Sequence, residues 1–218
     1  MTKSERINKL YDALYKSYGP QGWWPGESKL EYVLGAILTQ SASWKNVEKA
    51  LDNLKMANLI SVEKLNMITA DELAPLIRPS GYYNQKALKI KNFINFLIRH
   101  YSGSLDRMLR EERSVLRDKL LGIKGIGPET ADSIMLYAGD IPVFVIDAYT
   151  YRVMSRHGLV PEETNYGEMQ DIIMGSLTED AGIFNEYHAL LVKVGKEHCK
   201  KRAPQCKGCP LEYDPHAV

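Results

Sequence analysis

Apolar side chains recur every three or four residues along most of this chain, which is the spacing of helices with one buried face. At the start of the chain, Thr2 and Glu5 have the spacing of a capping box, and Gly19 with Pro20 ends the apolar pattern. Similar patterns predict helices that begin near Ser28, Ser43 and Thr69, and others that carry these apolar sets: Ala87, Ile90, Ile94, Leu97 and Ile98; Met169, Ile172 and Ile173; Ile183, Phe184, Tyr187, Leu190, Leu191 and Val194.

Only the segment 141–146 has the composition of a strand, and six residues without a partner strand cannot form a sheet. The pattern therefore predicts an all-α fold. No internal repeat or low-complexity linker interrupts the helices, so composition alone draws no domain boundary.

The stretch 114–158 organises the rest of the chain. A helical run from Ser114 leads into a turn that contains Gly125 and Gly127, and Pro128 follows where a first helical position tolerates proline. Such glycines let successive backbone N–H groups face an anion beside a helix N-terminus, which suits a phosphate. The spacing is neither a dinucleotide fingerprint nor a Walker loop. On the glycines alone, a plain helical corner without a ligand is an equally good interpretation.

Composition narrows the picture only moderately. The 218 residues carry a formal net charge of +1, so a nucleic-acid-binding face must be a local patch. No apolar stretch approaches the roughly 18 residues of a membrane span, and the N-terminus lacks the apolar core of a signal peptide. We expect a cytoplasmic protein without membrane contact. The three cysteines cluster near the C-terminus, which in a reducing compartment favours a metal centre or its remnant.

Three motifs together resemble the helix-hairpin-helix (HhH-GPD) DNA glycosylases of the endonuclease III superfamily. They are Lys124-Gly-Ile-Gly-Pro-Glu-Thr-Ala131 followed by Val145-Ile-Asp147, the segment Gly35-Ala-Ile-Leu-Thr-Gln40, and the cysteine run at the C-terminus. The resemblance implies two helical domains with a cleft between them. One is a helical barrel over residues 22–140 that contains the hairpin at about 114–138, and the other combines 1–21 with 141–218, including the Cys-rich loop 199–209.

The resemblance implies a base excision repair enzyme that acts on double-stranded DNA with a damaged base. Binding to DNA would associate the protein with the nucleoid. We expect it to be a monomer. Such an enzyme must rotate the nucleotide out of the stack, and Gln40 resembles the residue that fills the vacated space, although a helix-end cap is an equal alternative. The hairpin residues expected to bind DNA phosphate are Gly122, Lys124, Gly125, Ile126, Gly127 and Thr130.

Asp147 is the expected catalytic residue. Cleavage of an N-glycosidic bond builds positive charge on the deoxyribose, which a fixed carboxylate stabilises while it orients or deprotonates water. Asp147 also precedes a helical run, where its side chain could instead cap Thr150. The distance from the hairpin matches the family and favours the catalytic role.

Glu129 departs from the family pattern. Lyase-competent members have a lysine there, which attacks the sugar and forms a Schiff base, and a carboxylate cannot form an imine. We therefore expect a monofunctional glycosylase. Lys124 lies five residues earlier, in the turn itself, and suits a phosphate contact.

Trp24, Pro25 and Trp44 are the expected base pocket, because a Trp-Trp-Pro loop with a later aromatic residue resembles the 3-methyladenine glycosylase branch. Aromatic rings hold a cationic alkylated purine without protonating it, although a loop tryptophan is as often a lid on the core. The alternatives are a uracil, mismatch or oxidised-base glycosylase of the same family, or a non-catalytic DNA-binding helix-hairpin-helix protein.

Cys199, Cys206 and Cys209 have the family's spacing for three iron–sulfur ligands, but Pro215 stands where the fourth cysteine is expected. Either His216 or an outside group completes an atypical [4Fe-4S] cluster, or the loop is a remnant that has lost it; we favour the remnant. The glycosylase chemistry itself requires no cofactor.

The C-terminal part is the most basic region, and we expect phosphate contacts there rather than a merely solvated face. His188, on the last long helix, is expected to be structural. The basic residues are Lys193, Lys196, Lys200, Lys201, Arg202 and Lys207.

Overall fold

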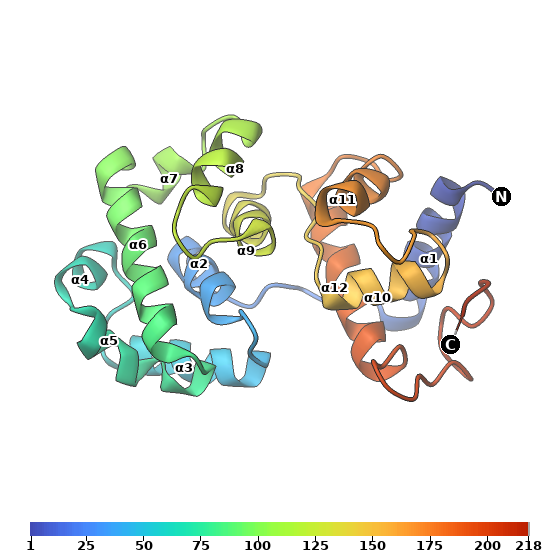
Figure 1. Cartoon of the computed structure of the whole chain (residues 1–218), viewed down its shortest axis with the longest axis horizontal. Helices are drawn as coiled ribbons and strands as arrows, with labels where there is room; N and C mark the ends of the chain where they lie inside the picture. The colour runs from blue at the N-terminus through green and yellow to red at the C-terminus, as the bar shows by residue number, and fades with distance from the viewer. Residues whose placement is uncertain (218) are drawn as a thin grey trace. The chain divides into compact units, whose positions relative to one another are not determined.

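The computed structural model describes residues 1–217, and in that part of the chain it contains twelve α-helices, one 3-10 helix, one π-helix and no β-strand (Figure 1). The all-α prediction is confirmed. The elements are α1 (Lys3–Tyr18), α2 (Lys29–Leu38), α3 (Trp44–Met56), α4 (Val62–Met67), α5 (Ala70–Leu76), η1 (Arg78–Ser80), α6 (Tyr83–Tyr101), α7 (Leu105–Met108), α8 (Arg113–Leu121), α9 (Pro128–Ser133), η2 (Ile134–Ala138), α10 (Ala148–Arg156), α11 (Tyr166–Met174) and α12 (Ala181–Glu197).

The chain divides into two compact units. The terminal unit comprises Met1–Trp24 and Pro142–Val218, and the central unit comprises Pro25–Ile141. Across the described range, no helix combines the length and the apolar character that a membrane span requires.

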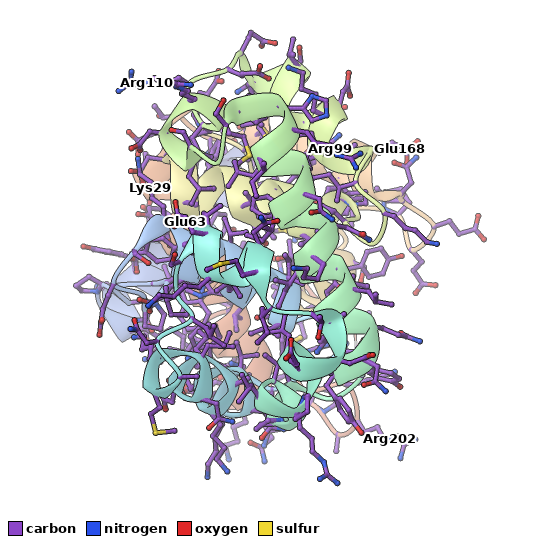
Figure 2. The ribbon with its side chains drawn as sticks, turned by 90° about the vertical axis from the view of Figure 1, so that its left-hand side faces the viewer. Lys29, Glu63, Arg99, Arg110, Glu168 and Arg202 are labelled. Atoms are coloured by element: carbon purple, nitrogen blue, oxygen red, sulfur yellow. The ribbon has the colours of Figure 1, made fainter. Side chains whose placement is uncertain are left out.

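Helix α2 forms the core of the central unit. Eight of its ten residues are buried, because neighbours on several sides cover it: α3, α6, α9 and η2 all contact it. The long helix α6 packs along α4 and α5 (Figure 1). In Figure 2 the side chains of Lys29 and Arg110 extend from the outer edge of this unit.

Helix α12 organises the terminal unit by packing against α1 and α10. Gly195 permits the close approach to α10, because a Cβ atom there would lie 2.6 Å from the Tyr149 ring. The segment that has strand-like composition, 141–146, contains no assigned β-strand and leads to the start of α10. Its residues Val143 to Ile146 are buried in the core, and the next residue, Asp147, is the N-cap of α10.

Several local predictions are confirmed. Capping boxes close the N-termini of α1 at Thr2 and α5 at Thr69, and Ser28 caps α2. Pro128 is the first residue of α9. The helix that starts at Thr69 ends at Leu76, where the chain turns into the 3-10 helix η1.

Candidate functional site

Asp147 is the N-cap of α10. Its Oδ1 accepts hydrogen bonds from the backbone N–H groups of Tyr149 at 3.0 Å and Thr150 at 2.7 Å. The capping geometry that the sequence offered as an alternative is therefore present. Both of these capping hydrogen bonds fall on Oδ1.

The second oxygen, Oδ2, faces His188 of α12. His188 Nε2 lies 3.6 Å from Oδ2, which is longer than a hydrogen bond. The side chain of His188 is 6% exposed, and that of Asp147 is 14% exposed. Burial raises the pKa of Asp147, but the His188 imidazole and the N–H of Thr150 lower it more, so that the net pKa lies below the ordinary 3.8. Asp147 is thus held ionised with one oxygen loosely engaged.

The sequence predicted a structural role for His188 and no contact with Asp147. It lies on the buried side of α12, where its ring also meets Phe144 edge-on with centroids 6.4 Å apart. A lone histidine among apolar residues gives no local signal of its partner. Only the packing of α12 against α10 brings it to Asp147.

The turn between α8 and α9 belongs to the central unit, and two isoleucines anchor it. Ile123 and Ile126 are buried, and the N–H of Ile126 donates to the carbonyl of Ile123 at 3.0 Å. Gly125 has φ +98°, a conformation that favours glycine. An ion pair in which Arg117 Nε meets the buried Asp132 at 2.7 Å joins the two helices. The predicted helix-turn-helix geometry is therefore present.

The hairpin is held from the side by α2 and α6. The Gln40 amide Nε2 donates to the Gly125 carbonyl at 3.1 Å and to the Thr130 hydroxyl at 2.8 Å, while Lys89 Nζ donates to Gln40 Oε1. The Lys89 stem lies on Gly125, where a Cβ atom would come within 2.5 Å of Lys89 Cγ. Asn92 adds a bond of 3.0 Å to the Lys124 carbonyl.

The predicted hairpin residues differ in exposure. Ile126 and Thr130 are buried, so they support the turn, whereas Lys124 and the glycines are exposed: Gly122, Gly125 and Gly127. Glu129, which the sequence resemblance places where lyase-competent members have a lysine, is exposed in the first turn of α9.

The predicted aromatic pocket is divided between the two units. Pro25 and Trp44 line one open hollow of about 540 Å³ in the central unit, whereas Trp24 is buried in the terminal unit beside Trp23, with ring centroids 5.5 Å apart. Several carboxylates line the same hollow as Trp44: Glu27, Glu31, Glu48 and Asp52. Lys55 pairs with Glu31 at 2.8 Å and with Glu27 at 3.3 Å.

The three cysteines line one cavity of about 320 Å³ together with His198 and His216. Arg156 of α10 donates to Cys199 Sγ at 3.3 Å, and burial, with the nearby cysteines, raises the pKa of the Cys209 thiol. Among residues 1–217, no three His, Cys, Asp or Glu side chains converge closely enough for a single metal ion. The donor set does not supply the four thiolates of an ordinary [4Fe-4S] cluster.

Two lysines of the basic region lie against aromatic rings of the terminal unit. Lys193 Nζ is 4.7 Å from the Tyr18 ring centroid, and Lys196 Nζ is 6.0 Å from that of Trp23. Lys200 donates to Gln205 Oε1 at 3.2 Å. Lys201, Arg202 and Lys207 are exposed, and Figure 2 labels Arg202 at the edge of the molecule.

The sequence profile of the HhH-GPD superfamily base excision DNA repair proteins matches residues 34–178, and the chain belongs to this superfamily. The match spans the Gln40 segment, the hairpin, Asp147 and α11. The resemblance drawn from the sequence is confirmed, and membership supports a DNA glycosylase of base excision repair as the enzyme class.

Individual relatives are consistent with membership of this superfamily. A Methanocaldococcus jannaschii protein provisionally named a DNA repair glycosylase is 46% identical over 212 residues, which covers 96% of each chain. A solved structure of the H. pylori 3-methyladenine DNA glycosylase bound to 1,N6-ethenoadenine is 30% identical with a TM-score of 0.78, and the match covers 90% of this chain and 98% of that one. An endonuclease III–DNA complex, 23% identical, shares the fold with a TM-score of 0.84 over 99% and 96%.

Proposed function

We propose that this protein is a monofunctional DNA glycosylase that hydrolyses the N-glycosidic bond of a flipped-out alkylated purine, such as 3-methyladenine, and leaves an abasic site in duplex DNA. The observation that carries the proposal is the state of Asp147. A partly exposed carboxylate whose pKa is lowered, with one oxygen capping α10 and the other 3.6 Å from His188 Nε2, suits the charge that develops in this reaction.

Asp147 acts through its charge. As the bond to the base lengthens, positive charge grows on the deoxyribose, and a fixed carboxylate in a water-poor site stabilises it. A carboxylate with a lowered pKa is a weak base, so orientation of the attacking water contributes more than early deprotonation of it. The methylated base leaves with the electron pair of the glycosidic bond and becomes neutral. The water oxygen then bonds to the cationic sugar and passes its proton to the Asp147 carboxylate.

Lyase chemistry is not expected. Glu129 is exposed in the first turn of α9, at the position where lyase-competent relatives have a lysine, and its carboxylate cannot form the imine. Lys124 lies in the turn itself, five residues before Glu129, and its backbone carbonyl accepts a hydrogen bond from Asn92. We assign it to phosphate binding together with the exposed N–H groups of the turn.

The hollow lined by Trp44 supports the proposed substrate class. An aromatic ring combined with the carboxylates of Glu27, Glu48 and Asp52 favours a cationic or electron-poor base over a neutral one. Bases alkylated at a ring nitrogen carry that charge and are good leaving groups. The H. pylori relative, a 3-methyladenine glycosylase bound to 1,N6-ethenoadenine, supports this choice. Pro25 lines the same hollow, and Trp24 stays a predicted pocket residue.

No step of the proposed reaction passes through a metal. The cysteine loop is tied to α10 by Arg156, which donates to the Lys200 carbonyl at 2.8 Å as well as to Cys199 Sγ. We therefore propose a structural role for this loop as a remnant of a cluster site. Iron content and visible absorbance of anaerobically purified protein test this assignment.

The experiment is a panel of duplexes that carry 3-methyladenine, 7-methylguanine, hypoxanthine, uracil or oxidised pyrimidines. We expect release of the methylated purines, strand breaks only after alkali treatment, and no protein–DNA adduct with borohydride. Release of uracil or an oxidised pyrimidine without release of 3-methyladenine would overturn the substrate class. A lysine adduct would falsify the monofunctional mechanism.

A further inference from the structure

A polar hollow beside the hairpin is the strongest unassigned feature of the central unit. It has a volume of about 390 Å³ and is lined by Gln40, Ser41, Tyr82, Gln85, Lys86 and Lys89. Two of the six side chains are cationic and none is acidic, so the lining favours an anion. The hollow lies next to the turn, because Lys89 and Gln40 contact Gly125 directly.

Lys86 is a buried cation whose ammonium group has an N–H donor available for a ligand. The residue is 1% exposed, and its ammonium donates to the carbonyls of Leu38 at 2.8 Å and Ser80 at 2.6 Å. An ammonium group has three N–H donors, and no third acceptor is found among the described residues. Burial, and then the charge of Lys89, lower the pKa of Lys86 to about 8. An anion in the hollow would relieve the repulsion between these two lysines.

The start of α6 adds to the positive potential of the hollow. Two residues that line it stand at this end of the 19-residue helix: Tyr82 is the N-cap, and Gln85 lies in the first turn. The Tyr82 side chain makes no capping hydrogen bond to the backbone N–H groups there. Uncapped N–H groups at the end of a long helix favour an anion. Lys89 holds Gln40 Oε1 with one donor and has two others.

We propose that this hollow binds a backbone phosphate of DNA, as a second phosphate site beside the hairpin, with Lys89 and the buried Lys86 as its cations. The proposal rests on the DNA-binding function above and deepens it. A phosphate there would lie beside Gln40, so that the side chain expected to enter the duplex would be positioned by the same contact.

The test measures the affinity for an undamaged duplex at several salt concentrations. Because each neutralised phosphate releases a counterion, Lys89→Gln should reduce the slope of log K against log salt by about 0.9. Lys89→Arg keeps the charge and should keep the slope, which separates charge from the packing of the stem on Gly125. Lys49→Gln, an exposed lysine of α3 outside the hollow, is the matched control and should behave as wild type.

Gln85→Glu provides a variant that leaves Lys89 and the hairpin contacts intact. It adds a negative charge to the lining and should weaken duplex binding at low salt by several-fold. Wild-type slopes in both Lys89→Gln and Gln85→Glu would overturn the proposal. Inorganic phosphate that shifts the backbone amide resonances of 83–85, combined with an unchanged duplex slope, would assign the hollow to a free anion and overturn the DNA contact.

The two proposals fail in distinguishable ways. Absence of duplex binding by the wild type would remove the DNA-binding function itself. Wild-type binding with an unaltered salt slope in the variants would remove only the second phosphate site.

Discussion

Two carboxylates of the terminal unit, Asp147 and Asp214, both have a lowered pKa, yet their surroundings differ. Asp214 is 2% exposed; it receives Arg6 Nε on Oδ1 at 3.0 Å and Arg6 Nη2 on Oδ2 at 2.6 Å, and His157 Nδ1 lies 2.8 Å from Oδ2. Asp147 receives two backbone N–H groups on one oxygen, and only a distant imidazole faces the other.

The difference separates a carboxylate with a structural role from the one to which we assign catalysis. Burial raises the pKa of Asp214, but the Arg6 guanidinium and His157 lower it more, and both of its oxygens are committed to these partners. That arrangement fastens the C-terminal segment to α1 and α10 and leaves no acceptor for a substrate. At Asp147 the charge is maintained by the His188 imidazole and by the N-terminus of α10, and we propose that Oδ2 faces the reacting sugar.

The largest expected effect comes from Asp147→Asn. Asparagine is as good an N-cap as aspartate, so α10 should keep its start while the charge is lost. We expect single-turnover release of 3-methyladenine to fall about 10³-fold, or ~4 kcal/mol of transition-state stabilisation. The melting temperature should change little. Wild-type activity in this variant would remove the catalytic assignment.

Asp214→Asn should show the opposite pattern. Removing one partner of a buried ion pair leaves an uncompensated charge on Arg6, whose side chain is 20% exposed, so the free energy of unfolding should fall by about 3 kcal/mol. The measurement is urea unfolding, with excision assayed well below the melting temperature. A variant of normal stability that had lost activity would reverse the comparison between the two carboxylates.

The pH dependence of stability sharpens the same contrast. Burial lowers the pKa of His157 by more than the neighbouring Asp214 raises it, so His157 is harder to protonate in the folded state than in the unfolded state. The stability that this difference contributes above pH 6.5 should therefore be lost as the pH falls below that value. The lowered pKa of Asp214 contributes stability above 3.8 that is lost as pH falls through the folded pKa. Urea unfolding across this pH range should show both losses of stability in the wild type. The loss at the lower pH, which belongs to Asp214, should be smaller in Asp214→Asn. An unchanged acid decline in the variant would contradict the assignment.

The smallest expected effect is that of His188→Gln. Without the imidazole, the pKa of Asp147 should rise, because burial raises it and a main opposing influence is lost. We expect excision at neutral pH to fall about tenfold, or ~1.4 kcal/mol, and the acid limb of the rate profile to move to higher pH. A reduced rate with an unmoved pH profile would instead indicate a packing role against Phe144.

The hairpin shows where sequence reasoning reaches its limit. The glycines, Pro128 and the helical pattern of 114–121 predict the turn, because backbone conformation is determined by neighbouring residues. The support given by Lys89 was not predictable in this way. It lies 36 positions before Gly125 and meets it only because α6 packs beside the turn.

Local spacing and residue type were enough to predict the all-helical class, the capped starts of the helices and the superfamily, and they also suggested that Glu129 replaces a family lysine. Tertiary structure decided which carboxylate has an open oxygen, that His188 faces Asp147, and that Lys86 and Lys89 share a hollow with Gln40. Those facts depend on how helices distant in sequence pack. Burial and neighbouring charge, which set a side chain's pKa and reactivity, exist only once that packing has formed.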